Sequence, residues 1–151
     1  MQLSQNTQQL FADFFSDLGL CRREEFPVIE VYVRRGSRLL TNVLMVDGIT
    51  FGRHIFINPR LAERDKQSLL RIPKTLMAHE IAHVVQYRRK GSLRFLFNYA
   101  RDFWRIFRKK EKWDLRSWFD SYLEIPHEIE ARKAASEFPK WLLDQNEGLS
   151  N

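Results

Sequence analysis

Three residues with clear chemical potential, His79, Glu80 and His83, form an H-E-x-x-H sequence. The apolar residues around them, in residues 75–87, predict a helix. Residues four apart on a helix share a face, so both imidazoles can reach one metal ion. Glu80 lies about 100° further round the helix, beside that ion. A carboxylate there can take a proton from water that attacks a carbonyl carbon and return it to the leaving nitrogen.

A zinc site of this kind needs a third protein ligand. The chain has four histidines, and the two outside the motif are His54 and His127. Glu128 and Glu130 are carboxylate candidates, but on a helix they lie about 200° apart, so only one can face the metal. Glu128 also fits an ordinary helix N-terminal charge, worth about 0.3–1 kcal/mol. The residues alone leave this choice open.

The elements around these residues predict an α+β fold. Apolar residues at helical spacing predict a helix over residues 7–18, ending at Gly19. We expect strands over 26–33, 39–46 and 49–58, and helices over 66–90 (interrupted at Pro73), 93–108, 113–123 and 126–138, the last closed by Pro139. Helix, short strands and then helices is the order typical of α+β proteins. Since one domain is about 100–200 residues long, we expect a single domain over residues 1–151.

The positive charge of the chain is concentrated in residues 88–112. The chain carries 25 Lys and Arg against 19 Asp and Glu, a net charge of +6. The segment holds ten basic and two acidic residues, a net +8, which leaves −2 for the rest. Such a segment indicates an anionic partner, namely nucleic acid, an acidic protein surface or lipid headgroups. The simpler interpretation is a solvated helix face.

Two function classes other than an enzyme follow from that segment. Aromatic residues among the cations suggest a nucleic-acid-binding module with a structural metal: Phe97, Tyr99, Phe103 and Trp104. A basic amphipathic helix with Trp and Phe also fits a helix that docks on membranes. However, the aromatics follow the apolar stripe of the predicted helix over 93–108, so we expect them to pack over the motif helix.

The composition bounds the compartment. Cys21 is the single cysteine, which excludes an intramolecular disulfide framework. The first twenty residues contain no Lys or Arg, unlike a secretory leader. The apolar runs fall short of the about 20 residues that span a bilayer. We expect a cytoplasmic protein, or one delivered by a route that the sequence does not mark.

Three stretches resemble the glutamate-type zincin metallopeptidases, and most closely the small bacterial zincin-like domains whose substrates are largely unassigned. They are residues 48–57 (GITFGRHIFI), 76–87 (LMAHEIAHVVQY) and 126–131 (PHEIEA). The resemblance covers roughly residues 45–137. It implies a short twisted β-sheet packed on the motif helix, followed by a helical part, with segment 88–112 inserted between the two ligand helices.

The resemblance also implies the chemistry. It makes His79, His83 and Glu128 the ligands of Zn²⁺, Glu80 the general base, and a peptide or protein the substrate. In the family the third ligand opens an E-x-x-x-D pattern, whereas this chain has Arg132 at the Asp position. That Asp normally supports a zinc-bound histidine. Here its role is empty or passes to another carboxylate, the candidates being Asp120, Glu124 and Glu130.

Other functional assignments stay open. The family binds peptide beside an edge strand, for which residues 50–57 are the candidate, with an ordinary core strand as the alternative. Tyr122, His127 and Arg132 could each stabilise the oxyanion. Two His and one carboxylate also occur in iron-dependent oxygenases, but those sites usually lie on β-scaffolds. The main alternative to a peptidase is a catalytically degenerate metal-binding domain that binds nucleic acid or an anionic surface through residues 88–112.

Overall fold

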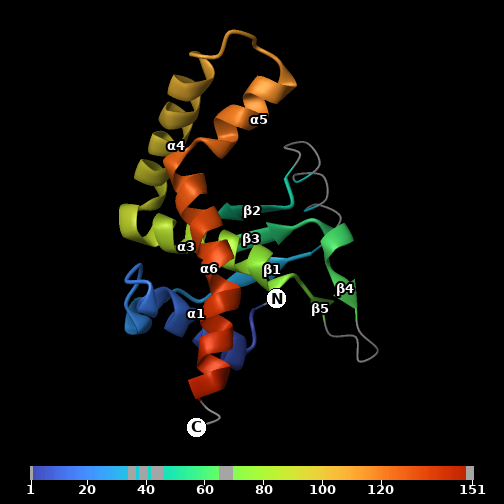
Figure 1. Ribbon diagram of the computed structural model, residues 1–151, viewed down its shortest axis with the longest axis vertical. Coiled ribbons are helices and arrows are strands. Elements are labelled where there is room, and N and C mark those ends of the chain that lie inside the picture. Colours follow the sequence, from blue (N-terminus) through green and yellow to red (C-terminus); the bar gives the residue numbers. More distant parts are fainter. Residues whose placement is uncertain (1, 34–36, 38–40, 42–45, 65–69, 149–151) are drawn as a thin grey trace.

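The computed structural model describes residues 2–33, 37, 41, 46–64 and 70–148 (Figure 1). Its helices are α1 (Gln5–Asp17), α3 (Lys74–Lys90), α4 (Ser92–Phe107), α5 (Leu115–Leu123) and α6 (Pro126–Gly148). Its strands are β1 (Glu30–Tyr32), β2 (Gly48–Phe51), β3 (His54–Ile57), β4 (Glu63–Arg64) and β5 (Leu70–Arg71), with short 3-10 turns at Arg23–Glu25 and Pro59–Leu61. The α+β class is confirmed.

The main sheet has the strand order β1-β3-β2. β1 runs parallel to β3, with Val31 beside Ile55, and β2 runs antiparallel to β3, with Thr50 beside Ile55. The single strand predicted over 49–58 is therefore wrong, because the chain turns back at Gly52. That glycine has φ +62°, a conformation that fits a tight hairpin turn and that other residues rarely adopt. Among the described strands, β2 consequently lies at the edge of the sheet.

The core lies between the sheet and the long helices. Ile55 and Ile57 of β3 alternate with half-buried residues and point into the core. α3 packs between this sheet and α6. In Figure 1, α6 crosses α3. From Met77 to Tyr87 every residue of α3 except His79 is buried. The motif helix is thus the central element of the fold.

The predicted start of the motif helix is wrong, and a second prediction, the strand over 39–46, falls mostly on residues that the structure does not describe. Residues 65–69 lie outside the described residues, but Leu70–Arg71 is the strand β5 paired with β4, and α3 starts only after Pro73. Proline cannot donate in a helix interior, so it suits the residue before the first turn better than a kink. The strand predicted over 39–46 lies mostly outside the described residues, and Thr41, which is described, is helical.

α6 continues through Pro139 to Gly148, so the predicted end at Phe138 is wrong. A proline inside a helix costs about 3 kcal/mol because it removes one backbone hydrogen bond and crowds the previous turn. Contacts beyond the proline offset that cost. Trp141 packs edge-on against Phe14, with ring centroids 5.4 Å apart, and its Nε1 donates to Asp17 Oδ2 at 2.8 Å. Tertiary packing thus overrides the local stop signal.

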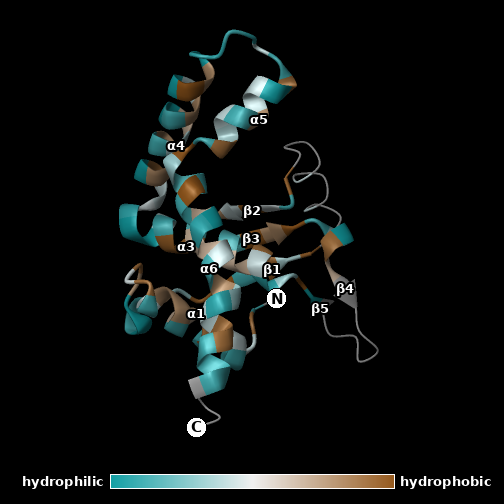
Figure 2. Cartoon of the chain, viewed as in Figure 1, coloured by the Kyte–Doolittle hydropathy of each residue, from teal (hydrophilic) through white to brown (hydrophobic). Residues whose placement is uncertain are grey.

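α4 and α5 form a helical hairpin that projects away from the sheet and α1 (Figure 1). Hydrophobic and hydrophilic residues alternate along α4 in Figure 2. The predicted apolar stripe does not pack over α3, because Leu93, Leu96, Phe97 and Trp104 are exposed. Phe95 is the one apolar residue of α4 that is fully buried, and it packs against Tyr87 with ring centroids 4.1 Å apart. Phe103 instead packs edge-on against Trp118 of α5, and Phe97 stays 68% exposed. None of the described helices is both long and apolar enough to span a bilayer.

Candidate metal centre

The structure brings His79, His83 and Glu128 together. His79 and His83 lie one turn apart on α3, and Glu128 lies in the first turn of α6. The two Nε2 atoms are 3.2 Å apart. His79 Nε2 is 3.3 Å from Glu128 Oε2, and His83 Nε2 is 3.2 Å from Glu128 Oε1. Among the described residues, this is the one cluster of three or more such side chains that could hold a metal ion.

These distances fit a tetrahedral metal ion. Zinc bonds to nitrogen and oxygen are about 2.0–2.2 Å long, so tetrahedral ligands lie about 3.3–3.6 Å from one another. The side chains of His83 and Glu128 are almost fully buried. Glu128 Oε2 is a buried atom that makes no hydrogen bond of good geometry among the described residues, although His79 Nε2 lies 3.3 Å from it. Buried polar atoms are normally satisfied, and a cation would satisfy this one.

A glutamine on the same helix orients His83. His83 Nδ1 lies 2.9 Å from Gln86 Oε1, and an amide oxygen can only accept, so Nδ1 carries the hydrogen. A neutral His83 therefore presents a lone pair at Nε2, the atom that faces the cluster. Gln86 Nε2 in turn donates to the His127 carbonyl at 3.0 Å and to Glu130 Oε2 at 2.7 Å. Sequence reasoning missed Gln86, although its position one turn after His83 was a usable signal.

Burial and mutual contact shift the pKa values of His83 and Glu128 in opposite directions. Burial acts against a charged His83, but its hydrogen bond to Glu128 and the charge of that carboxylate outweigh burial and raise the pKa of His83 to about 9. Burial likewise acts to raise the pKa of Glu128, but the neighbouring imidazoles of His79 and His83 hold it well below its usual range. The site thus concentrates one carboxylate charge beside two imidazoles, and a bound cation would take the place of the His83 proton.

Glu80 is held by the edge strand β2. Thr50 Oγ1 donates to Glu80 Oε2 at 2.7 Å. A Cβ atom built on Gly48 would lie 2.5 Å from Glu80 Oε1, so the carboxylate occupies space that only glycine leaves open. Burial raises the pKa of Glu80, while the two motif histidines act to lower it. The sequence did not reveal that Gly48 and Thr50, alternate residues of β2, position this group.

The other predicted metal-ligand candidates lie outside the cluster. His54 Nδ1 on β3 lies 3.4 Å from Glu30 Oε2. His127 Nε2 is 2.8 Å from Lys90 Nζ, and its ring packs edge-on against Phe95. Sequence reasoning could not separate His127 from Glu128, because both lie in the first turn of α6.

The three carboxylates that the sequence offered as supports of a zinc-bound histidine, Asp120, Glu124 and Glu130, lie in different surroundings. Glu130 reaches His83 through Gln86, as described above. Glu124 pairs with Lys110 at 2.6 Å, and Asp120 is exposed. Arg132, at the family's Asp position, donates to the Leu123 carbonyl and so ties the end of α5 to α6. The hydrogen-bonded support of His83 therefore comes from Gln86 on the motif helix.

Two tyrosines lie beside the third carboxylate. Tyr99 donates its hydroxyl to Glu128 Oε1 at 2.8 Å. Tyr122 also lines the space beside Glu128, and burial, followed by the charge of Glu128, raises the pKa of its hydroxyl. Of the three oxyanion candidates, only Tyr122 lines this space, whereas His127 and Arg132 do not. Sequence analysis named Tyr99 only among the aromatic residues of a possible nucleic-acid-binding segment, and its contact with Glu128 was not predicted.

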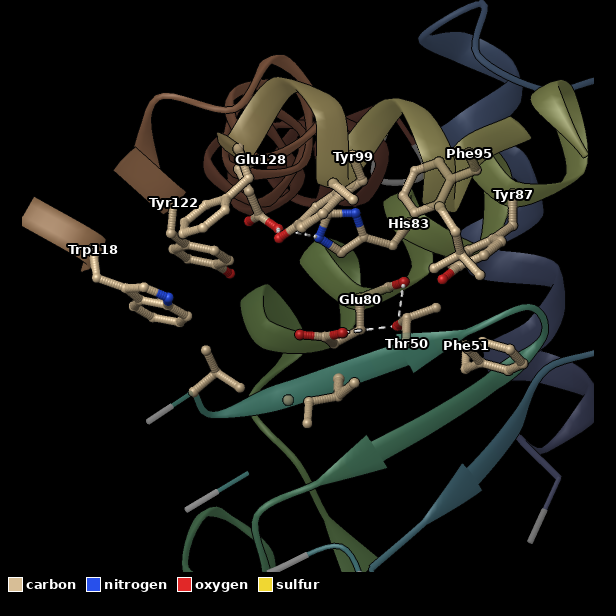
Figure 3. Close-up of a pocket in the computed structure, with 16 residues that line it drawn as sticks. Thr50, Phe51, Glu80, His83, Tyr87, Phe95, Tyr99, Trp118, Tyr122 and Glu128 are labelled. Atoms are coloured by element: carbon tan, nitrogen blue, oxygen red, sulfur yellow. Dashed lines mark hydrogen bonds and ion pairs between the residues drawn. The ribbon is translucent and has the colours of Figure 1, made fainter. Parts of the chain in front are cut away.

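These groups open into a cavity of about 360 Å³ between β2, α3, the α4–α5 hairpin and α6 (Figure 3). Its polar side chains are Thr50, Glu80, His83 and Glu128. Seven aromatic residues line the remainder together with small and aliphatic ones: Phe51, Tyr87, Phe95, Tyr99, Phe103, Trp118 and Tyr122. The candidate metal centre therefore faces an apolar cavity.

Comparison with known proteins adds a family match to this geometry. Residues 23–91 match the eCIS core domain. This family (extracellular contractile injection system core) is a zincin-like, metallopeptidase-associated domain. The matched segment contains the strands and α3, with His79, Glu80 and His83, but ends before Glu128 and covers fewer than half of the 151 residues. No curated protein and no solved structure matches the chain.

Proposed function

We propose that this protein is a zinc-dependent metallopeptidase with His79, His83 and Glu128 as metal ligands and Glu80 as general base. The observation that carries the proposal is the meeting of the three ligand atoms, from two helices, at separations of 3.2–3.3 Å. The H-E-x-x-H residues of α3 and the match to the eCIS core domain support it. Zinc is the metal proposed because two imidazoles and one carboxylate are a common ligand set of catalytic zinc.

Zinc, when bound there, would lower the pKa of its water to about 7 and polarise the substrate carbonyl. Glu80 takes the proton that the water loses as the water oxygen bonds to the carbonyl carbon. It then gives this proton to the scissile nitrogen as the C–N bond breaks, which leaves a carboxylic acid and an amine. Its buried position suits this role, since a raised pKa makes a stronger base. Tyr122, which lines the cavity beside Glu128, would donate to the carbonyl oxygen as its charge develops.

Metal content tests the ligand set. We would purify wild type, Glu128→Ala and Glu130→Ala without added zinc, offer zinc to each and measure metal by elemental analysis. We expect about one zinc per wild-type chain, lost in Glu128→Ala and retained in Glu130→Ala. A catalytic zinc site has three protein ligands, and Glu128→Ala would leave only the two histidines. Glu130 is the matched control, because it lies two residues away and reaches the cluster only through Gln86. Wild type without metal would contradict the proposal and favour a degenerate site.

Turnover tests the base. A screen of peptide substrates with the zinc-loaded protein would identify one that is cleaved, and Glu80→Gln would then be compared on it. General acid–base groups contribute about 10²–10⁴-fold, so we expect a loss of that size with metal content unchanged. A Glu80→Gln protein as active as wild type would exclude Glu80 as the base.

A second function is favoured by the tip of the α4–α5 hairpin. Trp104 and Trp113 pack together there, with ring centroids 6.0 Å apart, yet they stay 53% and 66% exposed. Leu115, beside them in the chain, is 72% exposed, and Lys109 and Lys112 flank the turn. Exposed tryptophans among cations are typical of groups that enter a lipid headgroup region, where each cation adds about 1 kcal/mol near an anionic surface. We therefore propose that the tip docks on anionic phospholipid.

Co-sedimentation with phosphatidylserine vesicles tests this second function, with phosphatidylcholine vesicles for comparison. We expect binding to the anionic vesicles only, weakening as salt rises, and loss of binding in Trp113→Ser. Leu143→Ser is the matched control, since Leu143 is 62% exposed on α6. Absence of binding to anionic vesicles would dismiss membrane docking, and salt-dependent binding to an oligonucleotide instead would assign the hairpin to nucleic acid.

A further inference from the structure

The cavity beside the candidate metal centre has a polar middle and apolar ends. In Figure 3 Glu80 and Glu128 lie between two aromatic groups. One consists of Trp118 and Tyr122, and the other of Phe51, Tyr87 and Phe95. The first group belongs to the α4–α5 hairpin, where Trp118 and Tyr122 are stacked. The reacting groups thus open onto apolar walls rather than onto other charges.

Such walls select their occupant. An apolar side chain placed there loses only water, whereas a charged or amide side chain would lose hydrogen bonds that the walls do not replace. The cavity volume of about 360 Å³ is near the lower limit of small-ligand sites, about 300–1,000 Å³, and so matches one bulky side chain rather than several.

The edge strand brings a substrate side chain to this space. β2 is paired with β3 on one side, no described strand pairs with its other edge, and its residues 48–51 line the cavity. A peptide added along the outer edge of β2 would be extended, and its side chains would point alternately to opposite faces. One side chain next to the scissile bond would then face the wall formed by Phe103 and Trp118.

We propose that this cavity is a specificity site for a bulky apolar side chain, so that the substrates are peptides with an aromatic or large aliphatic residue beside the cleaved bond. The inference rests on the proposed peptidase function and adds its substrate class. Trp118 is the specificity-determining residue, because it lines the cavity, is half-buried and belongs to the hairpin rather than to the ligand helices.

Binding without turnover tests the inference. Zinc-loaded Glu80→Gln protein would be titrated by calorimetry with hydroxamate-capped dipeptides that differ only in one side chain, Phe, Ala or Glu. Because a single methylene in an apolar pocket is worth roughly 10–200-fold, we expect the Phe compound to bind at least about tenfold more tightly than the Ala compound, and the Glu compound to bind most weakly. Equal affinities for Phe and Ala would overturn the inference.

Variants in the Glu80→Gln background locate the site. Trp118→Ala should reduce the Phe-to-Ala ratio toward one, whereas Phe97→Ala, which removes an exposed ring of the same hairpin, should leave it unchanged. Ala100→Phe, which adds a ring to a lining position of α4, should abolish binding of the Phe compound, and Arg94→Phe, on the exposed side of α4, is its control. An unchanged ratio in both Trp118→Ala and Ala100→Phe would overturn the inference, and thermal unfolding would verify that the variants are folded.

The outcomes separate this inference from the proposed function. Cleavage of peptides by wild type without side-chain preference would leave the peptidase standing and remove the specificity site. Selective binding of the Phe compound by a zinc-loaded protein that cleaves no peptide would support the apolar site and contradict hydrolysis. Failure of the protein to bind either zinc or the Phe compound would overturn both.

Discussion

The ligand region of α3 and α6 and the α4–α5 hairpin differ in how their residues are held. Around the ligands, each polar side chain meets a partner: Thr50 holds Glu80, and Gln86 holds His83. In the hairpin, two of the largest aromatic side chains, Trp104 and Trp113, contact each other and remain more than half exposed.

The difference shows how one chain can build a rigid centre and an adaptable surface. Groups that must keep a geometry within fractions of an ångström are placed on buried elements and fixed by hydrogen bonds. Groups that recognise a partner can remain exposed on a projecting element. The two regions share one boundary, the cavity, where Phe103 and Trp118 of the hairpin face the carboxylates of the ligand region. The following predictions set the two regions against each other.

The largest contrast is expected in stability. Phe138 of α6 is 1% exposed and stacks on Phe11, with ring centroids 5.0 Å apart, whereas Phe97 of the hairpin is 68% exposed. Phe138→Ala should lower the free energy of unfolding by about 3–5 kcal/mol, and Phe97→Ala should change it by about 0.5 kcal/mol or less. Urea unfolding measures both. A loss of several kcal/mol in Phe97→Ala would mean that the hairpin is part of the core.

The second contrast concerns the position of Glu80. In Gly48→Ala the new methyl group would lie 2.5 Å from Glu80 Oε1, and the side chain rather than the backbone would have to move. Since a displacement of about 1 Å can cost 10²-fold in rate, we expect turnover of a cleaved peptide to fall by about that factor, with zinc content and unfolding unchanged.

Thr50→Ser is the matched control for Gly48→Ala, because it keeps the hydroxyl that donates to Glu80. Its turnover should stay near that of wild type. If Gly48→Ala were fully active, the close approach of β2 would have no role in placing the base.

The third contrast concerns the orientation of His83. Gln86→Met keeps the approximate size of a buried side chain but removes the oxygen that accepts from His83 Nδ1. Loss of such a support typically weakens metal binding 10–100-fold, which we expect in a zinc titration against a competing chelator. Arg89→Ala, which removes an exposed partner of Glu130, should leave the zinc affinity unchanged. Equal affinities for wild type and Gln86→Met would show that the ring is oriented by packing alone.

The two regions also differ in how far the sequence predicted them. Helical spacing around His79 and His83 predicted α3 and the shared face of these two side chains, because both depend on residues close in the chain. Glu128, 45 residues further on, was chosen as the third ligand only through the family resemblance. The predicted end of α6 was wrong because Trp141, beyond Pro139, packs on α1. The β2–β3 hairpin was predicted as one strand because the alternation of residues continues across its two-residue turn. Such outcomes depend on contacts between distant segments, which no local pattern records.

Contacts between distant segments also explain why the packing of the α4–α5 hairpin was not predicted. The stripe on α4 correctly predicted a helix with an apolar face, but a stripe does not specify what covers it. In the structure Phe95 packs on α3, Phe103 packs on α5, and Phe97 is exposed. The contacts of Gln86 with His83 and of Tyr99 with Glu128 were missed for a related reason, since the apolar pattern around a polar residue does not identify its partner.

The smallest effect is expected at the start of α5, where Asp114 caps the helix. Its Oδ1 accepts from the Ser117 backbone N–H at 2.8 Å, and this bond lowers the pKa of the carboxyl. A lowered pKa in the folded state means that the stabilisation is present above the unfolded pKa of about 3.9 and is lost as the pH falls. Protection of the Ser117 amide from hydrogen exchange should therefore decline on acidification in wild type and be weak at every pH in Asp114→Ala, while amides of α3 keep their protection. Equal decline in α3 would indicate that the hairpin and the ligand region unfold as one unit, and the distinction between them would fail.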